Sequence, residues 1–275
     1  MNYIELKLTV PADFADILTA ELAELGFESF VETDEGLDAY IEEARFEADA
    51  VRQLAEKYAE QAAIAYQVSS LEKRNWNEEW ERDYQPIEVG QVRVRASFHQ
   101  PDERFRYDIV INPKMSFGTG HHETTAMMLQ HQQELDVTGK AVMDVGSGTG
   151  ILAIMAARQG ASRVLAFDVE EWAVENAVEN AALNGCPQIM VFLGTIDSVA
   201  ESERFDLVLA NINRNVLLDD IPAYATRLTS GATLLVSGFY ETDAPDITKK
   251  AEEAGLVRQS QLTRNNWASL RFLKP

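Results

Sequence analysis

Hydrophobic and polar positions along the first 72 residues follow a pattern whose period changes from element to element. Apolar side chains recur at every second position from Ile4 to Val10, which indicates a half-buried strand, and then at helical spacing as far as Gly26. The pattern predicts, in order, a strand at 4–10, a helix at 11–25, a hairpin at 27–41, a helix at 48–62 and a strand at 64–71. This order is typical of a small ferredoxin-like α+β domain, which we predict for residues 1–72.

Residues 73–84 are helical in pattern and connect this domain to the rest of the chain. Trp76 and Trp80 lie four positions apart, so they share one face of the predicted linker helix. We expect this face to pack on the second domain. A tryptophan patch that contacts substrate is the less favoured alternative.

From residue 85 onward, apolar runs typical of strands alternate with segments of helical spacing. Short strands are predicted at 87–94 and 105–111, and a helix at 126–133. The remaining elements are a strand–turn–helix unit at 141–157, helices at 170–184, 216–228 and 243–253, and strands at 163–167, 189–193, 205–211, 232–237, 256–262 and 267–273. This alternation predicts a doubly wound α/β domain over residues 85–275 whose last strand is antiparallel.

The strand–turn–helix unit contains three glycines at alternate positions, Gly146, Gly148 and Gly150. Glycine permits positive φ and lets a ligand approach the backbone, and the amides of the following helix favour polar or anionic groups. Asp168 ends the next strand, 22 residues after Gly146, where an acid typically holds ribose hydroxyls. A dinucleotide-binding loop would need a glycine where Ile151 stands, so a dehydrogenase is disfavoured. We predict a cofactor that contains a nucleoside; a plain strand-to-helix turn is the alternative.

The net charge of −21 restricts which partners the protein can bind. Such a surface repels phosphate backbones, so direct binding to nucleic acid is disfavoured, and a basic protein or an amine fits better. Residues 1–72 hold 17 acidic and 4 basic side chains, a balance of −13, and they contain no histidine, cysteine or glycine loop. We therefore interpret this domain as a binding module, with simple solubility as the alternative explanation of its charge.

The length of 275 residues and the 46% hydrophobic content suit one large domain or two ordinary ones. The single cysteine, Cys186, excludes intrachain disulfides and a zinc cluster. His121 and His122 are adjacent but have no acid–histidine cluster at metal-ligand spacing, so we predict no metal site. The chain opens without a basic-then-apolar leader, and its longest apolar run, Ile151 to Ala157, is too short to cross a bilayer. We expect a cytoplasmic protein that does not contact membranes.

Three motifs and one late tryptophan together resemble a known family. They are Phe117-Gly-Thr-Gly-x-His-x-Thr-Thr125, Asp144-x-Gly-x-Gly-x-Gly-Ile-Leu-Ala-Ile154, Ala210-Asn-Ile212 and Trp267. Over nearly its whole length the chain is similar to the ribosomal protein methyltransferases of the PrmA type, and the first motif is the most specific. The resemblance implies a seven-stranded class I methyltransferase (Rossmann-like) domain at 85–275 and S-adenosylmethionine as cofactor. It also implies methyl transfer to lysine ε-amines or the N-terminal α-amine of large-subunit ribosomal protein eleven.

The resemblance extends to individual site residues. In the family, four positions contact the cofactor, and they correspond here to Thr125, Gly146, Asp168 and Asn211. We add to the predicted cofactor-binding set their neighbours in the same motifs, Phe117, Gly118, Asp144 and Gly148. Asn211 is also the candidate catalytic residue, because its side-chain or backbone carbonyl can orient the amine or the cofactor. The sequence shows no convincing general base, so we expect the amine to lose its proton to water before it attacks.

Other interpretations of the same motifs stay open. The domain could methylate a small amine or RNA, or it could bind the cofactor as a sensor without catalysis. The acidic N-terminal domain disfavours RNA, and a small substrate would leave that domain without a role. The intact set of Thr125, Gly146, Asp168 and Asn211 argues against a decayed site. We expect a basic ribosomal protein as partner and a monomeric enzyme.

Overall fold

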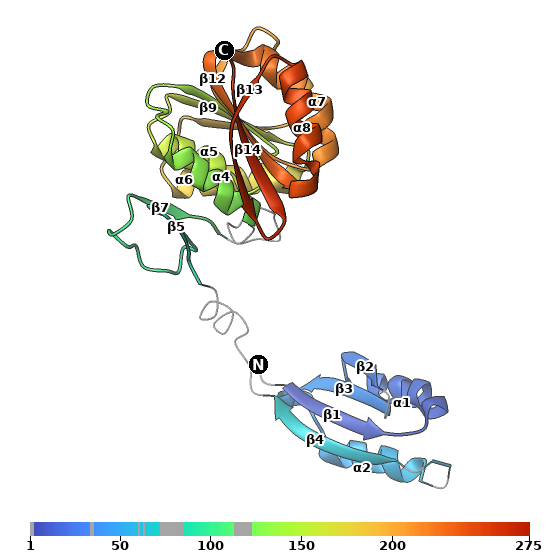
Figure 1. Cartoon of the computed structure of the whole chain (residues 1–275). Helices are drawn as coiled ribbons and strands as arrows, with labels where there is room; N and C mark the ends of the chain where they lie inside the picture. Colours follow the sequence, from blue (N-terminus) through green and yellow to red (C-terminus); the bar gives the residue numbers. More distant parts are fainter. Residues whose placement is uncertain (1–2, 34–35, 60, 63, 72–84, 113–122) are drawn as a thin grey trace. The chain divides into compact units, whose positions relative to one another are not determined.

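The computed structural model describes residues 3–33, 36–59, 61–62, 64–71, 85–112 and 123–275 (Figure 1). The chain divides into two compact units, Met1–Tyr84 and Gln85–Pro275. The predicted linker helix at 73–84, with Trp76 and Trp80, lies outside the described residues. The division of the first unit into a domain at 1–72 and a linker therefore stays a prediction.

The first unit is a four-stranded antiparallel sheet with α1 and α2 on one face (Figure 1). Its elements in chain order are β1 (Tyr3–Thr9), α1 (Ala12–Glu24), β2 (Ser29–Thr33), β3 (Gly36–Glu42), a 3-10 turn (Glu43–Arg45), α2 (Ala48–Lys57) and β4 (Ala65–Leu71). The strand order β2-β3-β1-β4 is the ferredoxin-like arrangement expected from the sequence. Leu6 and Leu8 alternate along β1 toward the helices and form the core with Leu18 and Leu22 of α1.

The second helix of this unit is shorter than the sequence predicted. α2 ends at Lys57, whereas the predicted helix continued to Ala62. Beyond the helix the chain turns, and the backbone amides of Gln61 and Ala62 both donate to the Tyr58 carbonyl oxygen, at 2.9 and 3.0 Å. Ala62 is nevertheless buried. An apolar residue at this position fits the helical spacing equally well whether it belongs to a last helical turn or to a buried turn after the helix. The predicted helix was therefore too long.

The second unit is organised around a seven-stranded sheet in the order β10-β9-β8-β11-β12-β14-β13. These strands are β8 (Ala141–Val145), β9 (Arg163–Asp168), β10 (Ile189–Leu193), β11 (Phe205–Asn211), β12 (Leu228–Tyr240), β13 (Val257–Arg264) and β14 (Trp267–Leu273). Strands β8 to β12 run parallel to one another, and β14 lies antiparallel between β12 and β13. The doubly wound sheet and the antiparallel last strand are thus confirmed.

Helices cover both faces of this sheet (Figure 1). On one face lie α4 (Glu123–Gln133), α5 (Ile151–Arg158) and α6 (Glu171–Leu183), on the other α7 (Arg214–Arg227) and α8 (Ala244–Glu253), and short 3-10 turns span Ile196–Ser198 and Glu241–Asp243. Successive residues of a central strand enter different cores: Val142 of β8 packs with α5, and Met143 packs with α7 and α8. No described helix is long and apolar enough to cross a membrane.

A small three-stranded sheet precedes α4. β5 (Ile87–Val89) pairs antiparallel with β6 (Val92–Arg95), and β7 (Tyr107–Val110) runs parallel to β6. The single strand predicted at 87–94 is wrong, because Gly90 adopts a φ of +58° and turns the chain between β5 and β6. Asn184 fixes β7 to the domain: its Nδ2 donates to the Val110 carbonyl at 2.7 Å, and its Oδ1 accepts from the Val110 amide at 2.9 Å.

Candidate active site

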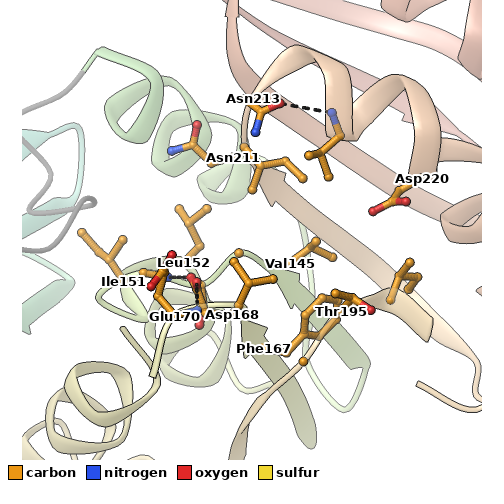
Figure 2. A pocket seen from close by; sticks show the side chains of 18 of the residues that line it. Val145, Ile151, Leu152, Phe167, Asp168, Glu170, Thr195, Asn211, Asn213 and Asp220 are labelled. Atoms are coloured by element: carbon orange, nitrogen blue, oxygen red, sulfur yellow. Dashed lines mark hydrogen bonds between the residues drawn. The ribbon is translucent and has the colours of Figure 1, made fainter. Parts of the chain in front are cut away.

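A cavity of about 350 Å³ opens at the carboxyl ends of the parallel strands (Figure 2). Each of four neighbouring strands contributes lining residues at its end, among them Gly146 after β8, Asp168 of β9, Thr195 after β10 and Asn211 of β11. Open α/β sheets bind ligands at this edge, because the loops that follow parallel strands converge there. The cavity is therefore the candidate active site.

The loop between β8 and α5 depends on its glycines. Gly146, Gly148 and Gly150 have φ values of +63°, +53° and +77°, in the left-handed region that other residues rarely adopt. A Cβ at position 146 would also lie 2.4 Å from Cγ2 of Ile212 in the facing loop. The loop leads directly into α5, whose first amides carry the partial positive charge of a helix N-terminus. This backbone can approach a ligand closely and favours its polar groups.

Asp168 is held in one orientation at the end of β9 (Figure 2). Its Oδ2 accepts from the Gly148 amide at 2.9 Å, and its Oδ1 accepts from the Glu170 amide at 3.1 Å. A carboxylate oxygen has two lone pairs, so each oxygen can still accept from a hydroxyl group in the cavity. The glycine loop and the acid, which the sequence suggests as separate contacts, are parts of one hydrogen-bond network.

Asn211 ends β11 and meets Thr125 of α4, although 86 positions separate them in the chain. The Nδ2 of Asn211 donates to the Thr125 hydroxyl at 3.3 Å, and Thr125 is fully buried. The Oδ1 of Asn211 is also buried and has no hydrogen-bond partner among the described residues. A buried carbonyl oxygen without a donor is costly. A donor group on a bound ligand would satisfy this atom.

Asp144 of β8 lies behind the glycine loop and is fully buried. Its Oδ2 accepts from the Ala153 amide at 3.0 Å in the first turn of α5, whereas Oδ1 has no partner in the described part of the chain. Burial, assisted by the charge of Asp168, raises the pKa of Asp144 to about 7. The side chain is absent from the cavity lining, so its visible contact is with α5.

The structure brings most of the predicted site residues together. Those that line the cavity are Thr125, Gly146, Gly148, Asp168 and Asn211. Asp144 does not line the cavity, because it lies behind the glycine loop. Phe117 and Gly118 lie outside the described residues. A direct contact of each of these residues with the cofactor stays a prediction.

Sequence reasoning missed other lining residues, among them three with polar or aromatic side chains. Thr195 follows the end of β10 by two positions, so the rule that ligands sit at strand ends could have found it. Trp172 of α6, which is 47% exposed, and Asp220 of α7 also line the cavity, and no motif marks them. Burial raises the pKa of Asp220, whose Oδ2 accepts from the Tyr224 hydroxyl at 3.2 Å.

The strand order with an antiparallel strand between β12 and β13, together with a glycine loop beside the cavity, defines a class I S-adenosylmethionine-dependent methyltransferase. The family described as ribosomal protein L11 methyltransferase (PrmA) matches residues 12–275. The chain belongs to this family, and the family predicted from the motifs is confirmed.

Curated relatives match the chain over nearly its full length. It is 45% identical over 260 residues to the ribosomal protein L11 methyltransferase of Porphyromonas gingivalis, which covers 94% of this chain and 90% of that protein. It is 40% identical over 279 residues to the enzyme of the same name from Phocaeicola vulgatus, with 99% of both chains covered. The crystal structure of ribosomal protein L11 methylase from Lactobacillus delbrueckii subsp. bulgaricus is similar with a TM-score of 0.64 and 29% identity, over 70% of this chain and 99% of that one.

The cavity residues fit S-adenosylmethionine. The fixed Asp168 carboxylate can accept from ribose hydroxyls, and the glycine loop leaves room for the ligand beside the backbone. Val169 and Ile196 add apolar lining, which suits a flat apolar ring such as adenine. The Oδ1 of Asn211, which has no partner among the described residues, is an acceptor suited to an ammonium or amine group.

Proposed function

We propose that this enzyme transfers the methyl group of S-adenosylmethionine to amines of ribosomal protein L11: lysine ε-amines, the N-terminal α-amine, or both. We propose further that it works in the cytoplasm, as a monomer. The observation that carries the chemistry is that Asn211 lines the cavity and that its buried Oδ1 has no donor among the described residues. An attacking amine is such a donor. The choice of substrate follows from the relatives, which are named ribosomal protein L11 methyltransferases.

The first requirement of the reaction is a neutral amine. The cofactor supplies a methyl group on a positively charged sulfonium, and only an amine with a free lone pair attacks it. A free lysine has a pKa of about 10.4, so deprotonation near pH 7.4 costs roughly 4 kcal/mol. Surroundings of low polarity lower the pKa of an amine. Val145, Ile151 and Phe167 supply such surroundings, because they line the cavity and are themselves almost fully buried.

Asn211 provides the second requirement, a fixed direction for the amine. Its Oδ1 accepts one N–H of the amine, which aims the nitrogen lone pair away from Asn211 and into the cavity. The bond from Nδ2 to the buried Thr125 hydroxyl keeps the amide from rotating. Alignment of the reacting atoms contributes several kcal/mol to rate enhancements in general. The proton leaves to water, since neither the motifs nor the contacts of Asn211 assign a general base.

Labelled S-adenosylmethionine tests the proposal. The enzyme is incubated with the labelled donor and either total ribosomal proteins or purified ribosomal RNA. We expect label in ribosomal protein L11 and none in RNA. Label confined to RNA would contradict the proposal, and donor binding without any transfer would favour the sensor interpretation.

Removal of the Asn211 amide tests the mechanism. We expect Asn211→Ala to lower kcat by about 100-fold, the cost of losing alignment in the reacting complex. Gln259→Ala, which removes an exposed amide on β13, serves as the matched control. Steady-state kinetics with the labelled donor give the result. Full turnover by Asn211→Ala would remove this residue from the mechanism.

A further inference from the structure

A second cavity, of about 300 Å³, adjoins the first, because Asn213 lines both. It lies where β12 ends and β14 begins, and Gly238, Tyr240 and Trp267 contribute to its lining. Trp267 is one of the residues that carry the family resemblance, yet it lies outside the lining of the first cavity. The first cavity, which we call the donor cavity because it fits the methyl donor, therefore adjoins a second cavity with aromatic walls.

Tyr240 and Trp267 form a stacked pair, directly opposite each other on β12 and β14. Their ring centroids are 4.3 Å apart and the ring planes meet at 30°. Tyr240 is 52% exposed, so this stack is not part of the hydrophobic core. Tyr240 thus presents aromatic surface beside the second cavity, which is typical of a binding surface.

A β-bulge in β12 directly precedes Tyr240, at the edge of the second cavity. The register of β12 against β14 shifts between Ser237 and Phe239, with Gly238 as the extra residue at a φ of +95°. Because side chains alternate along a strand, one extra residue changes the face that the following side chains take. Phe239 therefore shares a core with Val236, three positions earlier, and Tyr240 is the first side chain beyond the bulge that is exposed.

The same bulge connects the aromatic pair to the donor cavity. A Cβ at position 238 would lie 2.2 Å from the carbonyl oxygen of Ile212, so the backbone that follows β11 packs directly against Gly238. Ile212 lines the donor cavity between Asn211 and Asn213. The segment that holds the amine and the strand that carries the aromatic pair are therefore in backbone contact.

We propose that the Tyr240–Trp267 pair is the wall along which the alkyl-ammonium side chain of the acceptor lies as its nitrogen reaches Asn211. This assignment rests on the proposed function. Methylene groups pack on aromatic faces, and the ring quadrupole attracts a positive charge within about 6 Å of the centroid. A nucleic acid base would also stack there, but the net charge of −21 opposes its backbone.

The charged groups around the second cavity are consistent with a cationic ligand. Arg214 lines this cavity, but it pairs with Asp243 at 3.1 Å and with Asp246 at 2.5 Å. One guanidinium against two carboxylates leaves a negative balance. An incoming ammonium group is therefore attracted to this edge of the sheet rather than repelled.

Leucine and phenylalanine variants of the pair test the assignment in the full chain. Trp267→Leu and Tyr240→Leu should raise KM for ribosomal protein L11 by about tenfold each with a smaller change in kcat, because the lost contacts bind the acceptor. Trp267→Phe and Tyr240→Phe keep an aromatic face and should stay near wild type. The dissociation constant of S-adenosylhomocysteine, measured by calorimetry, should not change in any of the four.

The matched control is Val257→Ala, an exposed apolar position on β13 of the same hairpin that lines neither cavity. Leucine variants with wild-type KM would overturn the assignment, as would a loss that appears equally in S-adenosylhomocysteine binding. A wild-type enzyme that binds S-adenosylhomocysteine but labels no ribosomal protein would overturn the proposed function itself. The two failures are therefore distinguishable.

Tryptophan fluorescence gives a readout that does not depend on turnover. The chain has 4 tryptophans, and Trp267→Phe removes the one in the second cavity. Titration with ribosomal protein L11 in the presence of S-adenosylhomocysteine should change the emission of the wild type, and the change should largely disappear in Trp267→Phe. An identical change in both proteins would show that the acceptor does not reach this ring.

Discussion

The contribution of Asp144 to the free energy of unfolding depends on pH. Burial raises the pKa of this carboxyl from 3.8 to about 7. Between about pH 4 and pH 7 the folded protein therefore holds a proton that the unfolded chain releases. The stability linked to this group is complete below about pH 4 and is lost progressively between about pH 4 and pH 7, by roughly 4 kcal/mol in all.

Asp144→Asn tests this linkage. Asparagine keeps an acceptor for the Ala153 amide but carries no charge, so its stability advantage over wild type should be larger at pH 8 than at pH 5, by roughly 3 kcal/mol for the two pH units between 5 and 7. Urea unfolding at the two pH values gives the free energies. Asp136→Asn is the control of opposite sign: the bond from the Thr138 amide lowers the pKa of Asp136, so its ionised form contributes stability above the unfolded pKa. An equal advantage of Asp144→Asn at both pH values would contradict the linkage.

Individual site residues could be predicted where chain order fixes their position. Gly146, Asp168 and Asn211 each stand at the end of a strand, and strand ends are visible in the apolar pattern. Trp172 and Asp220 could not be found in this way. They lie within α6 and α7, and which side of a helix faces the cavity depends on how that helix packs on the sheet.

At the scale of elements, the apolar pattern located the central residues of each strand better than its ends. The run at 232–237 predicted only the middle of β12, which extends from Leu228 to Tyr240. The residues beyond Ser237 join the strand because β14 pairs with them after the bulge, and pairing with a distant segment leaves no local signal. β14 itself matches the predicted 267–273, since Asn265 and Asn266, both at positive φ, form a clear turn directly before it.

The bulge in β12 makes a prediction at this scale. Gly238→Ala places a side chain at a φ of +95° and a Cβ 2.2 Å from the Ile212 carbonyl oxygen. Gly231→Ala is the matched control, because its φ of +81° is similarly unfavourable but nothing lies within 4 Å. We expect the control to lose roughly 1–2 kcal/mol of unfolding free energy from backbone strain alone. Gly238→Ala should lose more.

Displacement of Ile212 should also weaken S-adenosylhomocysteine binding in Gly238→Ala, since Ile212 lines the donor cavity. Urea unfolding and calorimetry measure the two effects. The close contact at the bulge would be refuted if both alanine variants lost the same stability and bound S-adenosylhomocysteine equally well.

At the scale of the whole molecule, most of the net negative charge lies in the N-terminal part of the chain. Residues 1–72 carry −13 of the total −21, although they are little more than a quarter of the chain. A charge excess of this kind attracts a basic protein over distances of about a Debye length, about 10 Å at 0.1 M salt. The attraction acts on the encounter with the acceptor, whereas donor binding depends on the cavity in the second unit.

Neutralisation of exposed acids in the two units separates these effects. The triple variant Glu24→Gln, Glu43→Gln and Glu47→Gln changes the first unit, and Glu201→Gln, Glu252→Gln and Glu253→Gln changes the second; each shifts the net charge from −21 to −18. At low salt the first triple should lower kcat/KM for ribosomal protein L11 by roughly tenfold, and the second should lower it much less. The gap should close toward 1 M salt, where the Debye length is about 3 Å. Equal losses in the two triples would show that total charge, rather than the acidic N-terminal unit, attracts the substrate.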